Sequence, residues 1–254
     1  MCGRFTDMYT WDEIYAYYAM IDELARNWPP SFNVCPTDDV GVIVAKNGRR
    51  TFERMRWGLV PRWWSKSLKE SARLATFNAR AETVRTKPFF RDAFKTGRCL
   101  MPVSGYYEWH WNDPNDKKEK PQPWYFTRRD GGVMTIAALC ETWRDRSENQ
   151  TIRSCAMVIT APNAFVAEVH DRMPVVLEPH QFDQWTNGTA DEAAALMQPA
   201  PQDVLQKWPV SKRINSSRTP KDDATLIEPV DLARRDEGPQ GGLALSPAKT
   251  GTKA

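Results

Sequence analysis

The segments VMTIAALC (residues 133–140) and SCAMVIT (residues 154–160) decide the fold class of this chain. Both are short apolar runs containing β-branched residues, which is the pattern of buried strands. Similar runs occupy residues 40–45, 55–60, 98–103 and 124–127. Turn signals such as Asn47-Gly48 separate several of them. Because strand follows strand without a βαβ rhythm, we predict an α+β fold, a single domain with a curved, mostly antiparallel β-core flanked by short helices.

Short helices are predicted around this β-core. The first covers Thr10 to Arg26, where Thr10 and Glu13 form a capping-box pattern and apolar residues recur at helical spacing. We expect further helices at residues 88–95, 161–169, 179–186 and 191–198. A polar loop is expected at 112–120 and a last strand at 225–230. Large apolar residues then become scarce, so we expect a domain over residues 2–230 and a disordered tail over residues 231–254.

The composition of the 254-residue chain limits its class. Hydrophobic residues make up 41 %, enough for a sizeable core, and a net charge of +3 allows a nucleic-acid site only as a local basic patch. The five cysteines are widely spaced and form no C-x-x-C pair, so we expect no disulfide framework, no metal and no cofactor. No signal peptide or membrane span is recognisable, which favours a cytoplasmic protein without a membrane partner.

The second residue has unusual chemical potential. Initiator Met is commonly removed before a residue as small as Cys, and the mature chain would then begin with Cys2. Its α-amine and thiol would form a 1,2-aminothiol, in which both groups titrate near physiological pH. Such a group condenses with an aldehyde to a Schiff base, and the thiol then closes a thiazolidine ring. The alternative is that Cys2 is an ordinary residue of a frayed terminus.

Two segments in the first half of the chain carry further candidate polar residues. Asn78 and Arg80 are two apart in an extended segment, an arrangement suited to a phosphate or sugar oxygen, although Asn78 as a helix N-cap is the local alternative. Glu108 lies in the aromatic run GYYEW. Burial there would raise its pKa toward the range useful for acid–base catalysis, whereas an edge strand would leave it facing water.

A histidine and a tryptophan pair complete the candidate residues. His170 follows a predicted helix and precedes a strand, a common place for catalytic residues, although it also suits a structural helix cap. Trp63 and Trp64 follow Arg62 in a Pro-containing segment. Exposed tryptophans beside arginine hold single-stranded nucleic acid by stacking, and a loop anchored in the core is the alternative.

Seven motifs in a fixed order resemble the SRAP family, the SOS response-associated peptidase-like proteins that sense abasic sites in single-stranded DNA. The motifs are CGRF at 2–5, FNVCPT at 32–37, WGLVP at 57–61, NARAE at 78–82, GYYEW at 105–109, HDRMP at 170–174 and WPVS at 208–211. The resemblance extends over residues 2–230. It departs from the family at Met173, where a second arginine is often found, and in the long segment 65–77.

The resemblance implies site residues and a partner. Family members crosslink themselves to an abasic site through a thiazolidine formed by the processed N-terminal cysteine, here Cys2. The matched positions are Asn78, Glu108 and His170 for catalysis, Arg4, Arg80 and Arg172 for phosphate contacts, and Trp63, Trp64 and Trp109 near the bases. The implied partner is single-stranded DNA containing abasic sites, bound by a monomer in the DNA damage response.

Three functions remain open at this stage. In the first, Glu108 or His170 helps to open the sugar ring, Cys2 forms the crosslink, and β-elimination gives strand cleavage as a side activity. In the second, Cys2 and His170 act as a cysteine peptidase, with removal of Met1 as its least demanding reaction. In the third, the chain is a non-catalytic single-strand binder or adaptor. A DNA-bound protein would be nucleoid-associated in a bacterium or nuclear in a eukaryote.

Overall fold

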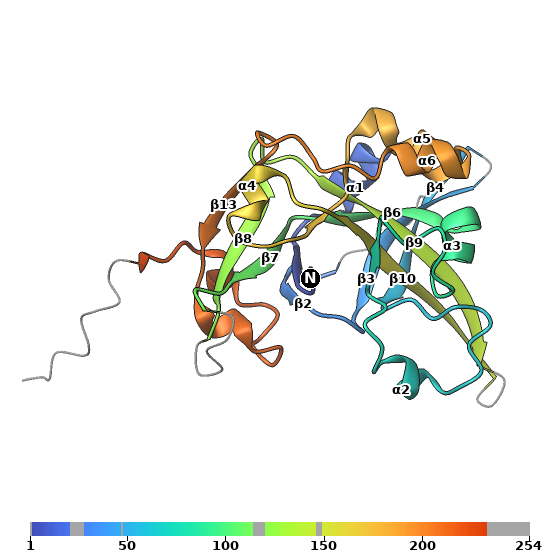
Figure 1. Ribbon diagram of the computed structural model, residues 1–254, viewed down its shortest axis with the longest axis horizontal. Coiled ribbons are helices and arrows are strands. Elements are labelled where there is room, and N and C mark those ends of the chain that lie inside the picture. The colour runs from blue at the N-terminus through green and yellow to red at the C-terminus, as the bar shows by residue number, and fades with distance from the viewer. Residues whose placement is uncertain (1, 21–27, 47, 114–119, 146–148, 233–254) are drawn as a thin grey trace, which may run out of the picture.

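The computed structural model describes residues 2–20, 28–46, 48–113, 120–145 and 149–232, and within them the chain forms two β-sheets (Figure 1). The smaller sheet contains, in spatial order, β13 (Leu205–Pro209), β8 (Gln122–Arg128), β7 (Gly105–His110), β1 (Phe5–Asp7) and β2 (Ser31–Val34). The larger contains β11 (Met173–Pro174), β10 (Gln150–Thr160), β4 (Arg49–Trp57), β3 (Asp39–Lys46), β6 (Arg98–Val103), β9 (Met134–Asp145) and β12 (Val176–Leu177), with β5 (Asn78–Arg80) paired to β10.

The larger sheet closes on itself. Strand β10 pairs with β4 at one side and with β9 at the other, so β10, β4, β3, β6 and β9 form a ring. Most pairings are antiparallel, and β10 runs parallel to β4 and β5. Closure pairs strand edges that would otherwise be open. The predicted α+β class with a curved, mostly antiparallel core is therefore confirmed.

The helices are short and lie around the sheets. They are α1 (Trp11–Tyr17), α2 (Leu68–Ser71), α3 (Arg91–Thr96), α4 (Ala164–Ala167), α5 (Phe182–Asn187) and α6 (Ala190–Ala195), with 3₁₀ turns η1 (Pro179–Gln181), η2 (Lys212–Asn215) and η3 (Ala224–Ile227). Residues from α1, α3, α5 and α6 join one face of the larger sheet in a buried apolar cluster. The opposite face packs against Phe5, Tyr106 and Phe126 of the smaller sheet.

The local sequence signals account for most element boundaries. The predicted capping box is present at α1, where Thr10 accepts from the Glu13 N–H and Glu13 accepts from the Thr10 N–H. The helix ends at Tyr17, so the prediction was too long over residues 18–20, and residues 21–26 lie outside the described residues. The strand predictions at 40–45, 98–103, 124–127, 133–140 and 154–160 are confirmed within β3, β6, β8, β9 and β10.

Three further predictions need correction. The strand predicted at residues 55–60 is the end of β4, which begins at Arg49 and ends at Trp57. The helix predicted at 161–169 is confined to α4, residues 164–167. The strand predicted at 225–230 is mostly the 3₁₀ turn η3, because the Asp223 carboxylate accepts from the Thr225 N–H and so caps the turn. Leu226 of this turn is buried in an apolar cluster. The polar loop joins β7 and β8 as predicted, and its residues 114–119 lie outside the described residues.

The start of the chain lies between the two sheets (Figure 1). Strand β1 pairs with β7 through Phe5 and Tyr106, and the Tyr107 N–H donates to the Arg4 carbonyl. Strand β5 pairs with β10 through Asn78 and Met157. The first residues therefore run beside β7 of one sheet and reach β5 of the other, which brings distant motifs to one place.

Candidate active site

Cys2 is buried at the junction of the sheets, with an exposed fraction of 1 %. Its carbonyl accepts a hydrogen bond from Nδ2 of Asn78 at 2.8 Å. Burial raises the pKa of the thiol well above its ordinary value, and the nearby Glu108 carboxylate raises it further. The thiol is therefore protonated at neutral pH, and it requires a base before it can react. The frayed terminus is excluded as an account of Cys2.

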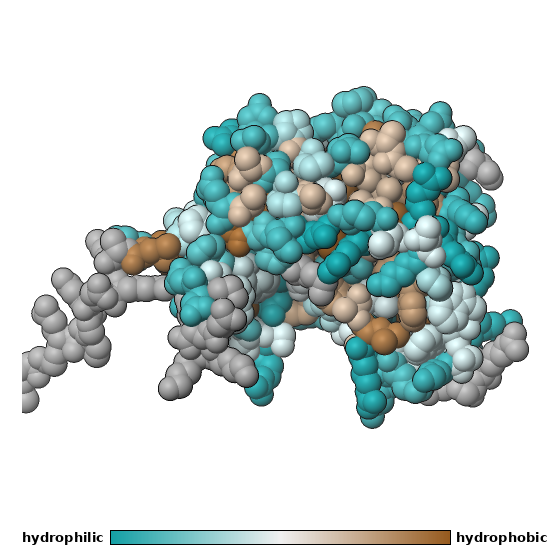
Figure 2. Space-filling view, viewed as in Figure 1, coloured by the Kyte–Doolittle hydropathy of each residue, from teal (hydrophilic) through white to brown (hydrophobic). Residues whose placement is uncertain are grey.

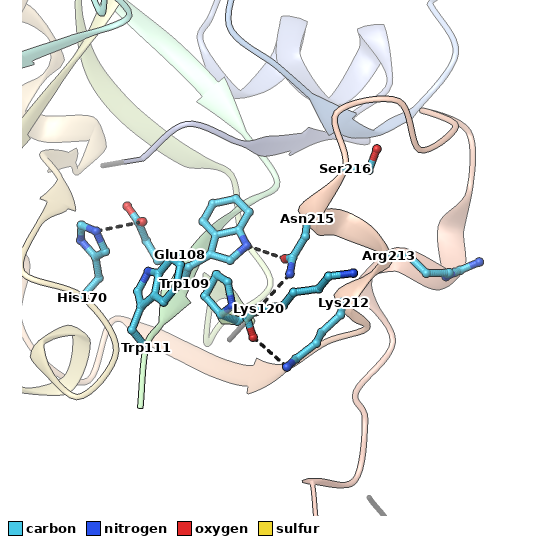
Figure 3. A pocket seen from close by; sticks show the side chains of 10 residues that line it. Glu108, Trp109, Trp111, Lys120, His170, Lys212, Arg213, Asn215 and Ser216 are labelled. Atoms are coloured by element: carbon cyan, nitrogen blue, oxygen red, sulfur yellow. Dashed lines mark hydrogen bonds and ion pairs between the residues drawn. The ribbon is translucent and has the colours of Figure 1, made fainter. Parts of the chain in front are cut away.

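Glu108 is the buried acid of the site, with an exposed fraction of 0 %. It points inward from β7, so an edge position facing water is excluded. Its Oε2 lies 3.6 Å from Nε2 of His170 (Figure 3). Burial raises its pKa from 4.5 to about 7. At neutral pH both forms of this carboxyl are populated, as a group that gives and takes protons requires.

His170 is oriented by its own turn. Its N–H donates to the Val166 carbonyl at the end of α4, and its Nδ1 accepts from the Arg172 N–H at 3.1 Å. Nδ1 also lies 3.2 Å from Oδ1 of Asp171, and Nε2 faces Glu108. Burial lowers the pKa of His170 and favours the neutral form of the imidazole. The backbone N–H of His170 thus bonds to the last turn of α4, whose C-cap residue is Glu168, while its side chain faces Glu108.

Asn78 is held by the pairing of β5 with β10 and by a side-chain contact to the residue before it. The segment before it is fixed because Nε1 of Trp57 donates to the Phe77 carbonyl at 2.9 Å, and β10 pairs with it on the other side. Asn78 is in a strand, so the helix N-cap alternative is wrong. Its Oδ1 is buried and accepts no hydrogen bond from a described residue. A buried acceptor without a donor is costly, and a ligand hydroxyl would satisfy it.

The three predicted arginines have different settings. Arg4 donates from Nη1 to Oδ1 of Asn33 at 2.7 Å and to the Ile214 carbonyl at 2.8 Å, and its guanidinium lies 5.8 Å from the Trp109 ring centre. Arg172 pairs with Glu82, which joins the HDRMP and NARAE motifs. Arg80 ends β5 and is exposed. Arg4 and Arg172 therefore also have structural roles at the edge of the site.

The predicted tryptophans fall into two separate places. Trp109 follows Glu108 on β7, and its Nε1 donates to Oδ1 of Asn215 at 2.7 Å. Trp63 and Trp64 instead pack on Phe89, with ring centres 5.2 and 5.9 Å from it. They line a different cavity of about 550 Å³ together with Trp143. Trp63 is 46 % exposed, as stacking would require.

A cavity of about 710 Å³ opens beside Glu108 and His170. Figure 3 shows these two side chains at one end and a group of basic and aromatic side chains along the rest. The lining residues absent from the sequence-based prediction are Trp111, Lys120, Pro121, Lys212, Arg213, Asn215 and Ser216. In the sequence, only the basic pair Lys212-Arg213 after the WPVS motif indicates DNA contacts among these residues. The cavity is large enough for a nucleotide-sized ligand.

The visible surface is mostly hydrophilic, with apolar residues in small separate groups (Figure 2). The large apolar side chains most exposed among the described residues are Trp63, Leu74, Trp111 and Leu232. Scattered single exposures of this kind are normal, and they do not form the broad patch of a protein interface. Among the described residues no helix is long and apolar enough to cross a bilayer, and no group of metal-ligating side chains is present.

The site therefore consists of a buried cysteine at position 2 that contacts the amide of Asn78 and the carboxyl of Glu108, with the imidazole of His170 next to that carboxyl and a cavity with basic lining residues beside them. The model of the SOS response associated peptidase (SRAP) family matches residues 1–217, and the chain belongs to this family. Its predicted membership is confirmed.

Characterised relatives cover nearly the whole chain. The chain is 31 % identical over 222 residues to the abasic site processing protein YoqW of Bacillus subtilis, covering 86 % of this chain and 96 % of that protein. It is 27 % identical over 242 residues to the abasic site processing protein YedK of Escherichia coli, covering 91 % and 100 %. A crystal structure of a Bacteroides thetaiotaomicron protein has the same fold, with a TM-score of 0.77 at 20 % identity and coverage of 90 % and 100 %.

Proposed function

We propose that this protein processes abasic sites in single-stranded DNA by forming a covalent thiazolidine crosslink through Cys2 after removal of Met1. The observation that carries the proposal is the convergence of Cys2, Asn78, Glu108 and His170 at the junction of the sheets. The names of the relatives, abasic site processing proteins, agree with it. The ring-opened sugar supplies the aldehyde that an aminothiol requires.

The first step is opening of the sugar. The abasic sugar exists mainly as a closed ring. Protonation of the ring oxygen breaks its bond to C1′, and the C1′ hydroxyl gives its proton to the carboxylate that the acid has become, which releases the aldehyde and restores the protonated acid. Protonated Glu108 is suited to this step because its pKa is about 7. His170 faces Glu108 through Nε2, so it serves as the partner that returns a proton to the carboxyl or takes one from it.

The crosslink follows in two steps. The neutral α-amine of Cys2 attacks C1′, and the resulting carbinolamine loses water, which takes its proton from Glu108. The Cys2 sulfur then adds to the carbon of the protonated imine: a C–S bond forms, the electrons of the C=N double bond move to nitrogen, and the nitrogen keeps the proton that it already carries. Because the pKa of the thiol is raised, the Glu108 carboxylate left by the previous step is the base that removes the thiol proton. Glu108 thus ends in its starting form.

Asn78 positions the reacting groups. Its Nδ2 fixes the Cys2 carbonyl and thereby the direction of the amine on the same residue. Its Oδ1, which accepts from no described residue, is available for a hydroxyl of the opened sugar. Fixing both reactants in this way removes the entropy cost of bringing them together.

The DNA strand is expected to pass over the cavity beside Glu108. Its side chains combine aromatic faces at Trp109 and Trp111 with the cations of Lys120, Lys212 and Arg213. Stacking and phosphate attraction of this kind suit a flexible single strand, tolerate any sequence and weaken with salt. We place the protein, as a monomer without a membrane partner, where DNA is: nucleoid-associated in a bacterium or nuclear in a eukaryote.

A cysteine peptidase is less well supported by the same geometry. Such an enzyme needs a thiolate paired with an imidazolium. Here the carboxyl of Glu108 faces His170, and its charge raises the pKa of Cys2. A non-catalytic binder does not require a buried acid, so the Glu108 carboxyl with its pKa of about 7 favours an enzyme. Strand cleavage by β-elimination from the Schiff base is a side activity of the proposed mechanism.

The test uses protein shown by intact mass to begin at Cys2. It is incubated with single-stranded DNA carrying one abasic site, and the products are separated on a denaturing gel. We expect a band that survives heat and detergent in the wild type and is absent for Cys2→Ala. Adducts of equal yield in both proteins would refute the role of Cys2, and no adduct in either would refute the crosslinking function.

A further inference from the structure

Three cysteines outside the active site converge on one face of the closed ring of strands. Cys99 on β6, Cys140 on β9 and Cys155 on β10 are far apart in the sequence and belong to the same buried cluster. All are free thiols. Cys99 and Cys155 are 0 % exposed, whereas Cys140 is 8 % exposed. The proposed function uses none of them.

The register places Cys140 directly opposite Cys155 in the β9–β10 pair. The Cys140 N–H donates to the Gly97 carbonyl at 2.6 Å, and the Cys155 carbonyl accepts from the Gly58 N–H at 2.8 Å. Both backbones therefore bond away from each other, so the two cysteines form a non-hydrogen-bonded pair. In such a pair the Cα atoms are about 4.5 Å apart and the side chains are at their closest. A disulfide spans Cα separations of about 4.4–6.8 Å.

The surroundings of Cys140 favour reaction at that sulfur. The Cys99 thiol donates to it and lowers the pKa of Cys140, and the Arg153 guanidinium lowers it further. Arg153 lies two residues before Cys155 on the same face of β10, paired with Glu53. Its Nε–H is buried and has no acceptor among the described residues. A thiolate at Cys140 would supply that acceptor, and thiolates are the oxidisable form of cysteine.

We propose that Cys140 is an oxidation site whose product is a disulfide with Cys155, formed by a hydroperoxide. The Cys140 thiolate attacks the peroxide, the O–O bond breaks, and the sulfenic acid forms with release of water or an alcohol. The Cys155 thiol then attacks the Cys140 sulfur, the S–O bond breaks, and the hydroxide leaves as water with the thiol proton. Two thiols are oxidised by two electrons, and one hydroperoxide is reduced.

The choice of partner is set by geometry. Cys99 is also near Cys140, but the β6–β9 register pairs it with Ala138, so it is diagonal to Cys140. Diagonal residues lie about 7–8 Å apart across a sheet. That separation exceeds the Cα range of a disulfide, whereas the directly opposed pair falls within it. Cys99 therefore supplies the hydrogen bond and Cys155 supplies the second sulfur.

Peptide mapping of the full chain tests this assignment. Reduced, folded protein is treated with hydrogen peroxide at neutral pH, remaining thiols are blocked with N-ethylmaleimide, and the protein is digested with trypsin. Cleavage after Arg98, Arg129, Arg144 and Arg153 puts the three cysteines on three peptides. We expect the Cys140 and Cys155 peptides joined and two hydrogens lighter than their sum. Complete alkylation of Cys140, or a Cys99–Cys140 linkage, would overturn the proposal.

The rate of disulfide formation in two variants separates the role of Arg153 from general damage to the fold. Arg153→Met is compared with Arg144→Met, an exposed arginine of the same β9–β10 pair. Loss of the Arg153 charge should slow formation of the disulfide by up to about tenfold, since one pKa unit changes the thiolate fraction tenfold. Arg144→Met should leave the rate unchanged. Equal rates in the two variants would refute activation by Arg153.

Discussion

Two cysteines of this protein, Cys2 and Cys140, are buried in opposite electrostatic surroundings. Cys2 lies beside the Glu108 carboxylate, and both burial and that charge raise its pKa. Cys140 receives a hydrogen bond from Cys99 and lies near Arg153, and its pKa is lowered. The same side chain is therefore kept as a thiol at one site and moved toward a thiolate at the other. At Cys2 burial is the larger cause of the raised pKa and Glu108 adds to it, whereas at Cys140 the hydrogen bond from Cys99 and the charge of Arg153 outweigh burial.

The two sites also differ in access. Cys2 lies next to Glu108, which borders a cavity of about 710 Å³. Cys140 lies within the ring of strands and is 8 % exposed. Cys2 is itself only 1 % exposed, so the cavity beside Glu108, and not the exposure of the thiol, is what offers a large substrate a path toward it, whereas Cys140 is expected to meet only small oxidants. A protonated thiol beside a cavity and an acid suits slow addition to an imine, and a thiolate in a tight space suits reaction with a hydroperoxide.

The largest expected effect separates the two cysteines directly. Cys2→Ser should abolish the thiazolidine crosslink, while its amine still forms a Schiff base that borohydride traps on abasic DNA. Cys140→Ser should leave the crosslink yield unchanged, because no atom of Cys140 takes part. Denaturing gels with and without borohydride measure both. Loss of the crosslink in Cys140→Ser, with the fold intact by circular dichroism, would contradict the division of roles.

Glu108→Gln should lower the crosslinking rate by about 100-fold or more, the usual contribution of a general acid–base group. In the wild type, the rate of the acid-assisted step should fall as pH rises above about 7, where Glu108 ionises. The variant should lack this dependence. Single-turnover rates from pH 5 to 9 give the measurement. A wild-type rate that continues to rise above pH 7 in parallel with conversion of the α-ammonium to the neutral amine would assign the acid step elsewhere.

The same substitution should stabilise the folded protein at alkaline pH. The pKa of Glu108 is 4.5 when unfolded and about 7 when folded, so the folded state binds more protons between these values. Stability from this group is complete below pH 4.5, is lost as pH rises to about 7 and stays lost above. Linkage gives about 3 kcal/mol at pH 8.

The control for this prediction is Asp7. Burial also raises the pKa of Asp7, to about 6, so it contributes in an overlapping pH range. Urea unfolding of wild type, Glu108→Gln and Asp7→Asn at pH 5 and pH 8 separates the two groups. Equal stability of Glu108→Gln and wild type at both pH values would show that Glu108 is not desolvated in the folded protein.

The sequence predicted the strands better than their arrangement. Apolar runs of β type define β6, β9 and β10 because those strands are buried on both faces. Their pairing depends on contacts between distant segments, so the closed ring was not predicted. Strands β8 and β9 are consecutive yet belong to different sheets. The Asp130–Gly132 turn signal marks a turn there without showing that it leads from one sheet to the other.

The candidate site shows the same limit. Cys2, Asn78, Glu108 and His170 were found through motifs in order, and the fold brings them together. The basic and aromatic residues of the cavity were missed because they come from a loop after β7 and from η2, which are about a hundred residues apart. Nor could the sequence show that Arg4 is anchored to Asn33 and the Ile214 carbonyl. Such contacts arise only in the folded chain.

The smallest effect concerns access to the Cys2 region. Trp111→Ala should weaken binding of an intact single-stranded oligonucleotide by about tenfold, because stacking of one base on an aromatic ring contributes about 1–3 kcal/mol. Trp111 is 43 % exposed and lines the cavity with Glu108 and His170. Leu74→Ala is the matched control, since Leu74 is 38 % exposed and lies in another cavity. Fluorescence anisotropy at fixed salt measures both without the covalent step. Equal affinities for the two variants would mean that the strand reaches Cys2 by another path, with the cavity serving the sugar alone.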